Sequence, residues 1–419
     1  MNNVGVAFKK AGLGVVSFFH RLDGKRGWRS FLASVICVAI GLLAGLILML
    51  CIDAGRAFQG FGVLLSQGFS DADSFGRVLY QSTPMMLSGV AIAFAFKLGL
   101  FNIGITGQVT MGAFTSLVLG LTMQANGFNG GNWFWCMLIA MVSGALVGFL
   151  TGFLKAKFNV NEVLSGIMLN WIIYYLIGLA GRYGLSVKSY KDPYANDYLL
   201  TMPAASRLPS LGITAMMGVS WGLIVAVLII VLLQIVLNKT VFGFELKLSG
   251  SNRFAAQYAG VSQAAKIIWA MTISGACAGI CGYMLYALPT NPTKFLWSSN
   301  GNSLLGDGFT GISVSLIAQN SPLGCIFSSL LLSLINSSQT SLKSVSDAFN
   351  IHYTELIKSL IIYIASFSSL FVYLIQKWHD DNKLFKAQGT LSERPEATPG
   401  SLKRKKREKP VASEGKEGK

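Results

Sequence analysis

The residues best suited to specific chemistry lie in a polar stretch between two long apolar runs, GFELKLSGSNRFAAQYAG, residues 243–260. Asn252 is a residue type that caps helix N-termini, and Gly260 is a type that ends helices. Phe254 and Tyr258 stand four apart, so one helical face would present both rings. The stretch therefore predicts a short helix that docks onto a soluble partner protein. An ordinary solvated loop is the alternative.

Small and charged residues complete this predicted docking surface. The alanines would let the helix seat closely in a groove, and we expect Gly243 and Gly250 to permit turns. Glu245 would pair with a basic residue of the partner or with Lys247. The residues assigned to the surface are Glu245, Asn252, Arg253, Phe254, Ala255, Ala256, Tyr258, Ala259 and Gly260.

A second informative stretch is FKLGLFNIGITGQVTMGAF, residues 96–114. Asn102 and Gln108 place amide groups among apolar residues, and the glycines Gly104 and Gly107 interrupt the run. Buried amides need hydrogen-bond partners, and irregular backbone in an apolar medium needs cover from protein or from a water-filled cavity. Two interpretations stay open, a broken helix that lines a pathway and a tight turn between two helices. These four residues are predicted pathway or gate positions.

Three other polar residues are candidates for the same pathway. Glu162 opens an apolar helix, where an acid favours the helix dipole, or it lies at a gate. Asn170 lies eight residues later on nearly the same helical face and could present its amide to a solute. Asp307 precedes Gly308 and either caps a turn or faces the pathway.

The sequence offers no basis for catalysis. It contains no G-x-x-x-x-G-K-[ST] phosphate-binding loop and no plausible Ser/His/Asp set. Its three histidines are scattered, and its six cysteines show neither zinc nor disulfide-framework spacing. We therefore expect a protein that is not an enzyme and that carries no cofactor or metal of its own.

Composition places these residues in a membrane protein. The 419 residues are 52% hydrophobic and only 12% charged, about half the charged share of an ordinary soluble domain. The net charge is +16, and Lys and Arg gather at residues 1–30 and 377–419. Basic ends that flank apolar segments fit the positive-inside rule, so no nucleic acid partner is implied. The basic run Lys403–Lys409 is a solvated tail or lies against anionic lipid.

Apolar runs predict an all-α, polytopic membrane protein with about ten transmembrane helices. Small residues four apart, such as Gly144, Gly148, Gly275 and Gly279, predict close helix packing. An even number of spans puts both termini on the cytoplasmic side, with loop 238–265 there and loops 53–78 and 182–218 outside. The predicted spans are 31–52, 79–97, 105–123, 133–154, 163–181, 219–237, 266–288, 304–319, 322–338 and 355–376.

Three regions follow from this pattern. Residues 1–30 form a basic, interfacial N-terminal segment on the cytoplasmic side. Residues 31–376 form the transmembrane domain, and residues 377–419 form a disordered basic tail.

Four blocks of the sequence resemble bacterial ABC-importer permeases of the nucleoside and simple-sugar branch. They are TPMMLSGVAIAFAFKLGLFNIGITGQ (83–108), NVNEVLSGIMLNWI (159–172), GFELKLSGSNRFAAQYAGV (243–261) and DGFTGISVSLIAQNSPLG (307–324). The blocks occur in the order typical of that family and extend the resemblance over about residues 30–376. Thr106 departs from the acidic residue that is usual at its position, and Lys247 from the usual arginine.

The resemblance implies a type II-like importer fold in the bacterial cytoplasmic membrane, with residues 243–260 as its coupling loop. It implies three protein partners beside the lipid membrane: a second, unlike permease subunit, a cytoplasmic ATPase with two nucleotide sites, and an extracytoplasmic substrate-binding lipoprotein that delivers solute. ATP and Mg would bind the ATPase chain. The FNIG form is similar to the longer permease of nucleoside importers, which favours nucleosides. A simple sugar such as ribose or a galactoside is the alternative, and an ion-driven secondary transporter is a further one.

Overall fold

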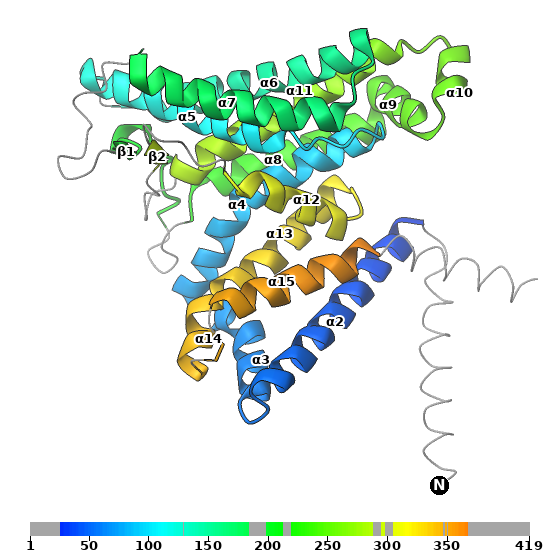
Figure 1. Cartoon of the computed structure of the whole chain (residues 1–419). Helices are drawn as coiled ribbons and strands as arrows, with labels where there is room; N and C mark the ends of the chain where they lie inside the picture. Colours follow the sequence, from blue (N-terminus) through cyan, green and yellow to red (C-terminus); the bar gives the residue numbers. More distant parts are fainter. Residues whose placement is uncertain are drawn as a thin grey trace, which may run out of the picture. The chain divides into compact units, whose positions relative to one another are not determined.

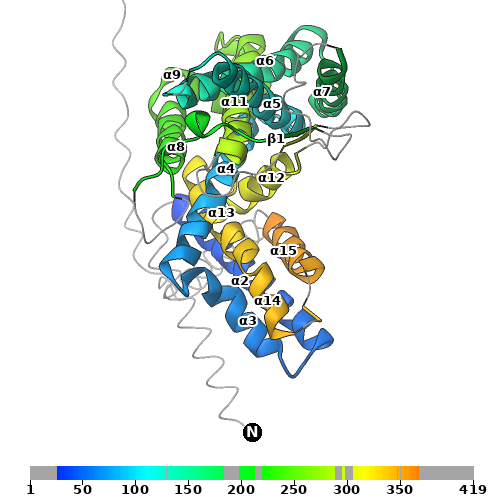
Figure 2. The same cartoon turned by 90° about the vertical axis from the view of Figure 1, so that its left-hand side faces the viewer.

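The computed structural model describes residues 26–128, 130–183, 198–212, 219–287, 295–297, 305–346, 348–349 and 351–367. Nearly all of them are helical (Figures 1 and 2). The exceptions include two three-residue strands, β1 (Tyr198–Leu200) and β2 (Phe295–Trp297), which pair antiparallel. The long helices are α2 (Arg26–Ile52), α4 (Ala72–Phe96), α5 (Ile105–Ala125), α6 (Asn132–Phe158), α7 (Glu162–Tyr183), α8 (Trp221–Lys239) and α11 (Gln263–Ala287).

The shorter helices lie between and after these. They are α3 (Ala57–Ser66), α9 (Val241–Ser251), α10 (Arg253–Tyr258), α12 (Asp307–Ile317), α13 (Pro322–Ser337), α14 (Gln339–Val345) and α15 (Ile351–Ser366), with 3-10 turns η1 (Gln67–Phe69) and η3 (Ala204–Ser206). Helix α2 begins within the predicted N-terminal segment 1–30. The predicted tail 377–419 and residues 1–25 lie outside the described residues.

Within the described residues, the seven long helices are each long and apolar enough to cross a membrane, and a bent pair of helices raises the number to eight. In that pair the chain bends by 116° between α12 and the helical segment that begins with α13. The sequence had predicted two full spans here, 304–319 and 322–338. Helix α12 has 11 residues and is about 16 Å long, too short for a bilayer core of about 30 Å. The prediction of loop 53–78 was also wrong in part, because α3 occupies its middle.

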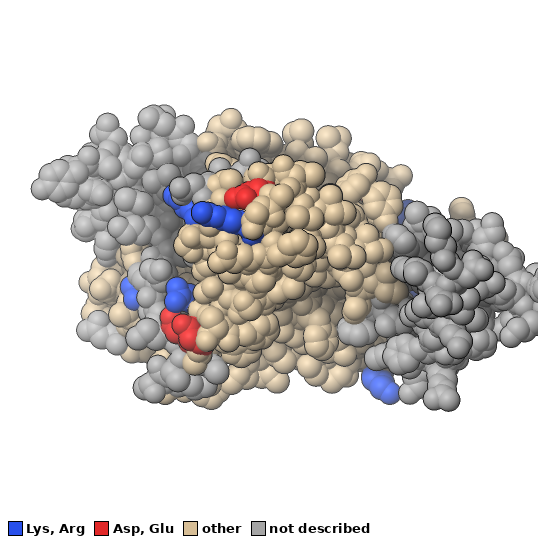
Figure 3. Space-filling view, turned by 90° about the horizontal axis from the view of Figure 1, so that it is seen from below, with Lys and Arg blue, Asp and Glu red and all other residues tan. Residues whose placement is uncertain are grey.

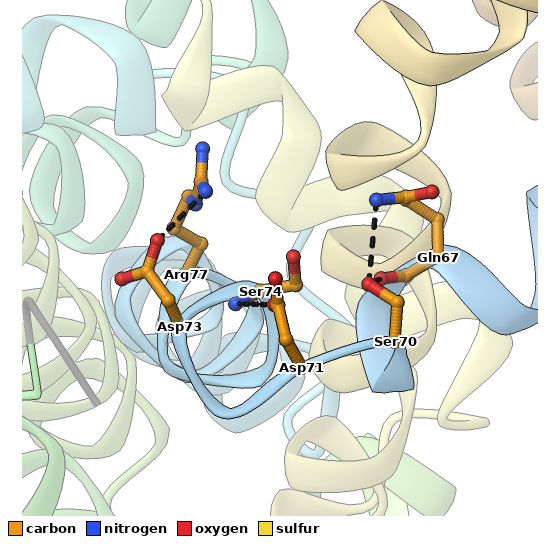
Figure 4. A network of polar contacts seen from close by, with 6 residues as sticks. All are labelled: Gln67, Ser70, Asp71, Asp73, Ser74 and Arg77. Carbon is orange, nitrogen blue, oxygen red and sulfur yellow. Dashed lines mark hydrogen bonds and ion pairs between the residues drawn. The ribbon is translucent and has the colours of Figure 1, made fainter. Parts of the chain in front are cut away.

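Helix α4 begins at a well-formed cap (Figure 4). The carboxylate of Asp71 accepts a hydrogen bond of 2.7 Å from the backbone N–H of Ser74, which satisfies an orphan donor of the first turn. This contact with Ser74 lowers the pKa of Asp71 below its ordinary value. Asp73 and Arg77 form an exposed ion pair one turn further on. The cap fixes where the α4 span starts after the short α3–η1 segment.

The core lies where α4, α5, α6 and α11 pack together, and glycines set its closest contact (Figures 1 and 2). The glycine strips of α6 and α11 face each other, which confirms the predicted close packing. A Cβ on Gly144 would lie 2.3 Å from the carbonyl oxygen of Gly275, and one on Gly148 would lie 2.3 Å from that of Met271. The two backbones therefore touch, with no side chain between them.

Gly144→Ala is expected to lower the melting temperature of the detergent-purified protein by several degrees. The added methyl has no room, and overpacking of a tight core costs about 1–3 kcal/mol. Gly62→Ala in α3 is the matched control, because a Cβ there has no atom within 4 Å. Equal melting temperatures for the two variants in a thermal unfolding scan would contradict the glycine interface.

A second layer joins α2 and α15 to α3 and α14 around the buried residues Met49, Leu64, Phe349 and Ile357. Gly41 and Gly45 of α2 pack against Ile361 and Ile357 of α15. Among the described residues in Figure 3, which shows the face seen from below, a few charged groups stand on a surface of other residues. Such a face suits contact with lipid.

Candidate docking segment and buried amide network

Helices α9 and α10 project at one end of the bundle, between the end of α8 and the start of α11 (Figure 1). Thr240 caps α9, because its hydroxyl accepts a hydrogen bond of 3.1 Å from the N–H of Gly243. A Cβ on Gly243 would lie 2.2 Å from the carbonyl oxygen of Val236 in α8. Gly243 and Gly250 lie inside α9, so the expectation that they form turns was wrong. They allow close approach of backbone instead.

Both ends of α10 are capped as the sequence predicts. The side chain of Asn252 accepts a hydrogen bond of 3.1 Å from the N–H of Ala255. At the other end Gly260 has a φ of +77°, its N–H donates to the carbonyl of Gln257, and Val261 donates to Ala256. This pair of bonds is a Schellman motif, which favours glycine at the left-handed position. The short helix is therefore held at both ends.

The exposed face of α10 carries two aromatic rings. Phe254 is 76% exposed and Tyr258 is 94% exposed. Large aromatic side chains that are exposed together to this degree are typical of a surface that binds another molecule. Ala255 and Ala259 are exposed beside them. Ala256 is fully buried against this chain, so its assignment to the docking surface was wrong. A helix of period 3.6 turns it away from Phe254 and Tyr258.

The base of the segment is held by ionic contacts within the chain. The Glu245 carboxylate pairs with Lys266 at the start of α11, where we expected Lys247 or a partner protein. Lys266 also lies 4.7 Å from the ring centroid of Phe242. Lys247 instead donates to the side-chain oxygen of Asn238 over 3.2 Å. These contacts tie α9 to α8 and α11.

A separate contact ties α10 to α11. The side chain of Arg253 is exposed, and its backbone carbonyl accepts a hydrogen bond from the side-chain amide of Gln263, the first residue of α11. The docking segment is therefore anchored at both of its helices.

Helix α9 also rests on the turn that follows α4. A Cβ on Gly250 would lie 2.2 Å from the carbonyl oxygen of Lys97 and 2.9 Å from the Cα of Leu98. Gly99, with a φ of +76°, reverses the chain at this point. A displacement of α9 therefore acts directly on residues 97–104, the segment that carries Asn102.

The amides of that segment are sealed inside the protein. Asn102 and Gln108 are fully buried and bind each other through two amide hydrogen bonds of 2.9 and 3.3 Å. Asn102 also donates to the hydroxyl of Ser274 in α11 over 2.9 Å, and Ser274 donates to the carbonyl of Ala91 in α4 over 2.7 Å. The network joins α4, α5 and α11, and in this conformation it presents no polar atom to a solute.

Asn170 holds the start of α5 against α7. Its side-chain oxygen accepts a hydrogen bond of 2.8 Å from the N–H of Gly107, and its amide donates to the carbonyl of Ile103 over 3.1 Å. The two helices approach closely there, since a Cβ on Gly104 would lie 3.1 Å from the Cα of Gly166. The structure thus brings Asn102, Gln108 and Asn170 together around the start of α5.

Among the described residues, neither of the two predicted acidic gate residues takes part in the hydrogen bonds of this cluster. Glu162 forms an ion pair of 2.9 Å with Lys155, at the turn from α6 to α7, and both side chains are about 85% covered. Asp307 opens α12. Its neighbour Gly308 packs against Thr106 of α5, whose buried hydroxyl has no hydrogen-bond partner among the described residues.

Sequence reasoning missed the residues that connect these parts. Ser274 lies in an apolar run, and Gly250 is a residue type typical of turns, although each provides the contact between two distant segments. The only signal was residue size, because a small residue in a long helix permits close approach of another backbone. In the described ranges, no group of three His, Cys, Asp or Glu residues could hold a metal ion.

A bundle of several helices that are each long and apolar enough to cross a membrane is the architecture of a multi-pass membrane protein. The chain belongs to the family described as branched-chain amino acid transport system / permease component, whose model matches residues 74–366. No solved structure matches the chain.

Three curated relatives show what this chain is similar to. The guanosine ABC transporter permease protein NupP of Bacillus subtilis is 34% identical over 302 residues, which is 72% of this chain and 83% of that protein. The nucleoside ABC transporter permease protein NupB of Lactococcus lactis is 30% identical, over 73% of this chain and 83% of that protein. The glucose ABC transporter permease protein TsgB13 of Haloferax volcanii is 26% identical, over 84% and 92%.

Proposed function

We propose that this chain is the transmembrane permease subunit of an ATP-driven importer that takes up nucleosides. The observation that carries the transport role is the bare aromatic pair Phe254 and Tyr258 on a helix capped at both ends. A helix held in this way is suited to insertion into a groove of a partner protein. The two relatives with the highest identities reported above act on nucleosides, which favours nucleosides over glucose.

The partner at α10 is a cytoplasmic ABC ATPase with two nucleotide sites, which binds the ATP and Mg. The α9–α10 segment is then cytoplasmic, and with it both termini, in a bacterial cell membrane. An extracytoplasmic substrate-binding lipoprotein delivers the solute at the opposite end of the bundle. A second, unlike permease subunit completes the pathway, and this chain binds no cofactor.

The structure suggests how the ATPase would drive the pathway. A movement of α10 is passed to α9, and α9 touches the 97–104 segment through Gly250. That segment is bonded to α11 through Asn102 and to α7 through the backbone of Ile103 and the side chain of Asn170. Helices α7, α9 and α11 would therefore shift together with α10, as a two-state gate requires.

Uptake by a deletion strain tests the proposal. Cells that lack the chromosomal gene and carry the wild-type copy are expected to accumulate radiolabelled guanosine or another nucleoside, and depletion of ATP should stop the uptake. Labelled ribose and glucose are the comparison solutes. If the cells take up a sugar and no nucleoside, the transported solute is the sugar. Transport by the purified chain under an ion gradient, without an ATPase, would overturn the ATP-driven mechanism.

A further inference from the structure

A polar cavity of about 290 Å³ lies among α4, α11, α12, α13, α14 and α15, and none of its lining residues belongs to the docking segment or to the amide network. Its polar lining includes Gln81, Asp307, Asn336, Glu355 and Lys358. The volume is at the lower end of the range for small-molecule sites, about 300–1,000 Å³. None of these residues except Asp307 stood out in the sequence.

The cavity lies at membrane depth. Gln81 and Pro84 line it, and at 1.5 Å per residue they lie about 14–18 Å from the first residue of α4, near the middle of this 25-residue span. Gly308, next to Asp307, packs against Thr106 at the start of α5. Ionisable groups at this depth are costly, and in membrane proteins they mark solute pathways or polar networks with a function.

The polar groups of the cavity are only partly satisfied by the protein. The Lys358 ammonium binds Glu355 over 3.2 Å and Asn336 over 3.3 Å, which leaves one of its three N–H groups. The side-chain oxygen of Gln81 is buried and has no hydrogen-bond partner within the described part of the chain. Among the described residues, Asp307 has no cation within 4 Å. The Gln81 oxygen and one N–H of Lys358 are therefore available to a solute, and the Asp307 carboxylate has no ion pair among the described residues.

The charge of the cavity restricts what that guest can be. Asp307 and Glu355 against Lys358 give one formal negative charge, so a phosphorylated solute would be repelled. A carboxylate and an amide oxygen accept hydrogen bonds well from a pair of neighbouring hydroxyls, such as those of a sugar ring. An apolar wall is also present, from Pro84, Met85 and Leu285.

We propose that this cavity is a solute-contact site of the pathway, in which Asp307 and Gln81 accept hydrogen bonds from the ribose hydroxyls of a nucleoside and Lys358 donates one. The site deepens the proposed function and rests on it. It would select nucleosides over nucleotides, because its net charge disfavours phosphate. It is lined by the first residue of α12, Asp307, and by Asn336 near the end of α13.

The first test is uptake by the complete transporter in proteoliposomes at saturating loaded binding protein. Asp307→Asn is expected to lower the rate of nucleoside uptake at least ~10-fold, since a hydrogen bond to a charged group is lost. Ser359→Ala, at an exposed position of α15 outside the cavity lining, is the control and should stay near wild type. Wild-type rates for Asp307→Asn and Gln81→Leu together would overturn the site.

The second test does not depend on the activity of a variant. In a Gln81→Cys protein, a small water-soluble thiol reagent is expected to label the introduced thiol more slowly when the transporter is loaded with a nucleoside, while a nucleoside monophosphate gives no protection. The exposed native Cys51 is the internal control and should react equally in both states. Equal labelling of position 81 with and without nucleoside would refute the site. Failure of wild-type uptake would instead refute the proposed function.

Discussion

Tyr258→Asp and Phe254→Asp are each expected to abolish ATP-driven uptake and to prevent the ATPase from co-purifying with this chain. Both rings are bare in the isolated chain, so they are free to bury their full surface in a partner. Aromatic anchors at the centre of an interface cost about 2 kcal/mol or more when lost, which is about 30-fold in affinity for each ring. The folded chain should be unaffected, because neither ring packs in the core.

Two variants separate the loss of a ring from the gain of a charge. Tyr258→Phe keeps the ring and should retain most of the uptake. Gln257→Asp adds the same charge at an exposed position of the same helix and should bind the ATPase much better than Tyr258→Asp. Pull-down with the ATPase and uptake are the two measurements. Full co-purification of the ATPase with the double aspartate variant would show that α10 does not dock it.

Gly250→Ala is expected to give the opposite pattern, an ATPase that still binds but no longer drives uptake. The added Cβ would lie 2.2 Å from the carbonyl oxygen of Lys97, so α9 must move away from the 97–104 segment. The contact that passes motion from α9 to Asn102 is then broken, while Phe254 and Tyr258 stay in place. Uptake should fall about 10-fold or more, with ATP hydrolysis no longer stimulated by loaded binding protein.

The neighbouring substitution Ser251→Ala is the control, because Ser251 is exposed at the end of α9. It should leave uptake and ATPase binding unchanged. If Gly250→Ala transports at the wild-type rate with a normal melting temperature, the α9 contact with Lys97 does not carry the coupling. If the ATPase no longer co-purified with Gly250→Ala, this would also contradict the assignment of ATPase binding to Tyr258 and of motion transfer to Gly250.

The sequence predicted the long helices well, because about 20 apolar residues in a row leave few other structures in a membrane. The ends of α5, α7 and α8 lie within two residues of the predicted spans. The resemblance to ABC-importer permeases was confirmed at the level of the family. The break at residues 318–321, where Gln319 and Asn320 adopt a left-handed backbone, falls at the boundary predicted between spans 304–319 and 322–338, but the prediction of two full spans there was wrong because α12 is only 11 residues long.

The polar contacts were harder to predict than the helices. The pairing of Glu245 with Lys266 and the burial of Ala256 depend on how α9, α10 and α11 cross, and a single sequence does not encode crossing angles in a readable form. The roles of Asn102, Gln108, Glu162 and Asn170 in transport stay predictions. Their positions suggest that they hold helices together in the conformation described.

The glycine contact between α6 and α11 restricts where this protein can bend. Backbone carbonyls of one helix pack directly against glycines of the other, so a small sliding movement along the helix axis would cause steric clashes. Only a jump of a whole helical turn would recover the fit. Helices α6 and α11 are therefore expected to move as one rigid body, so that any displacement of α11 is also a displacement of α6.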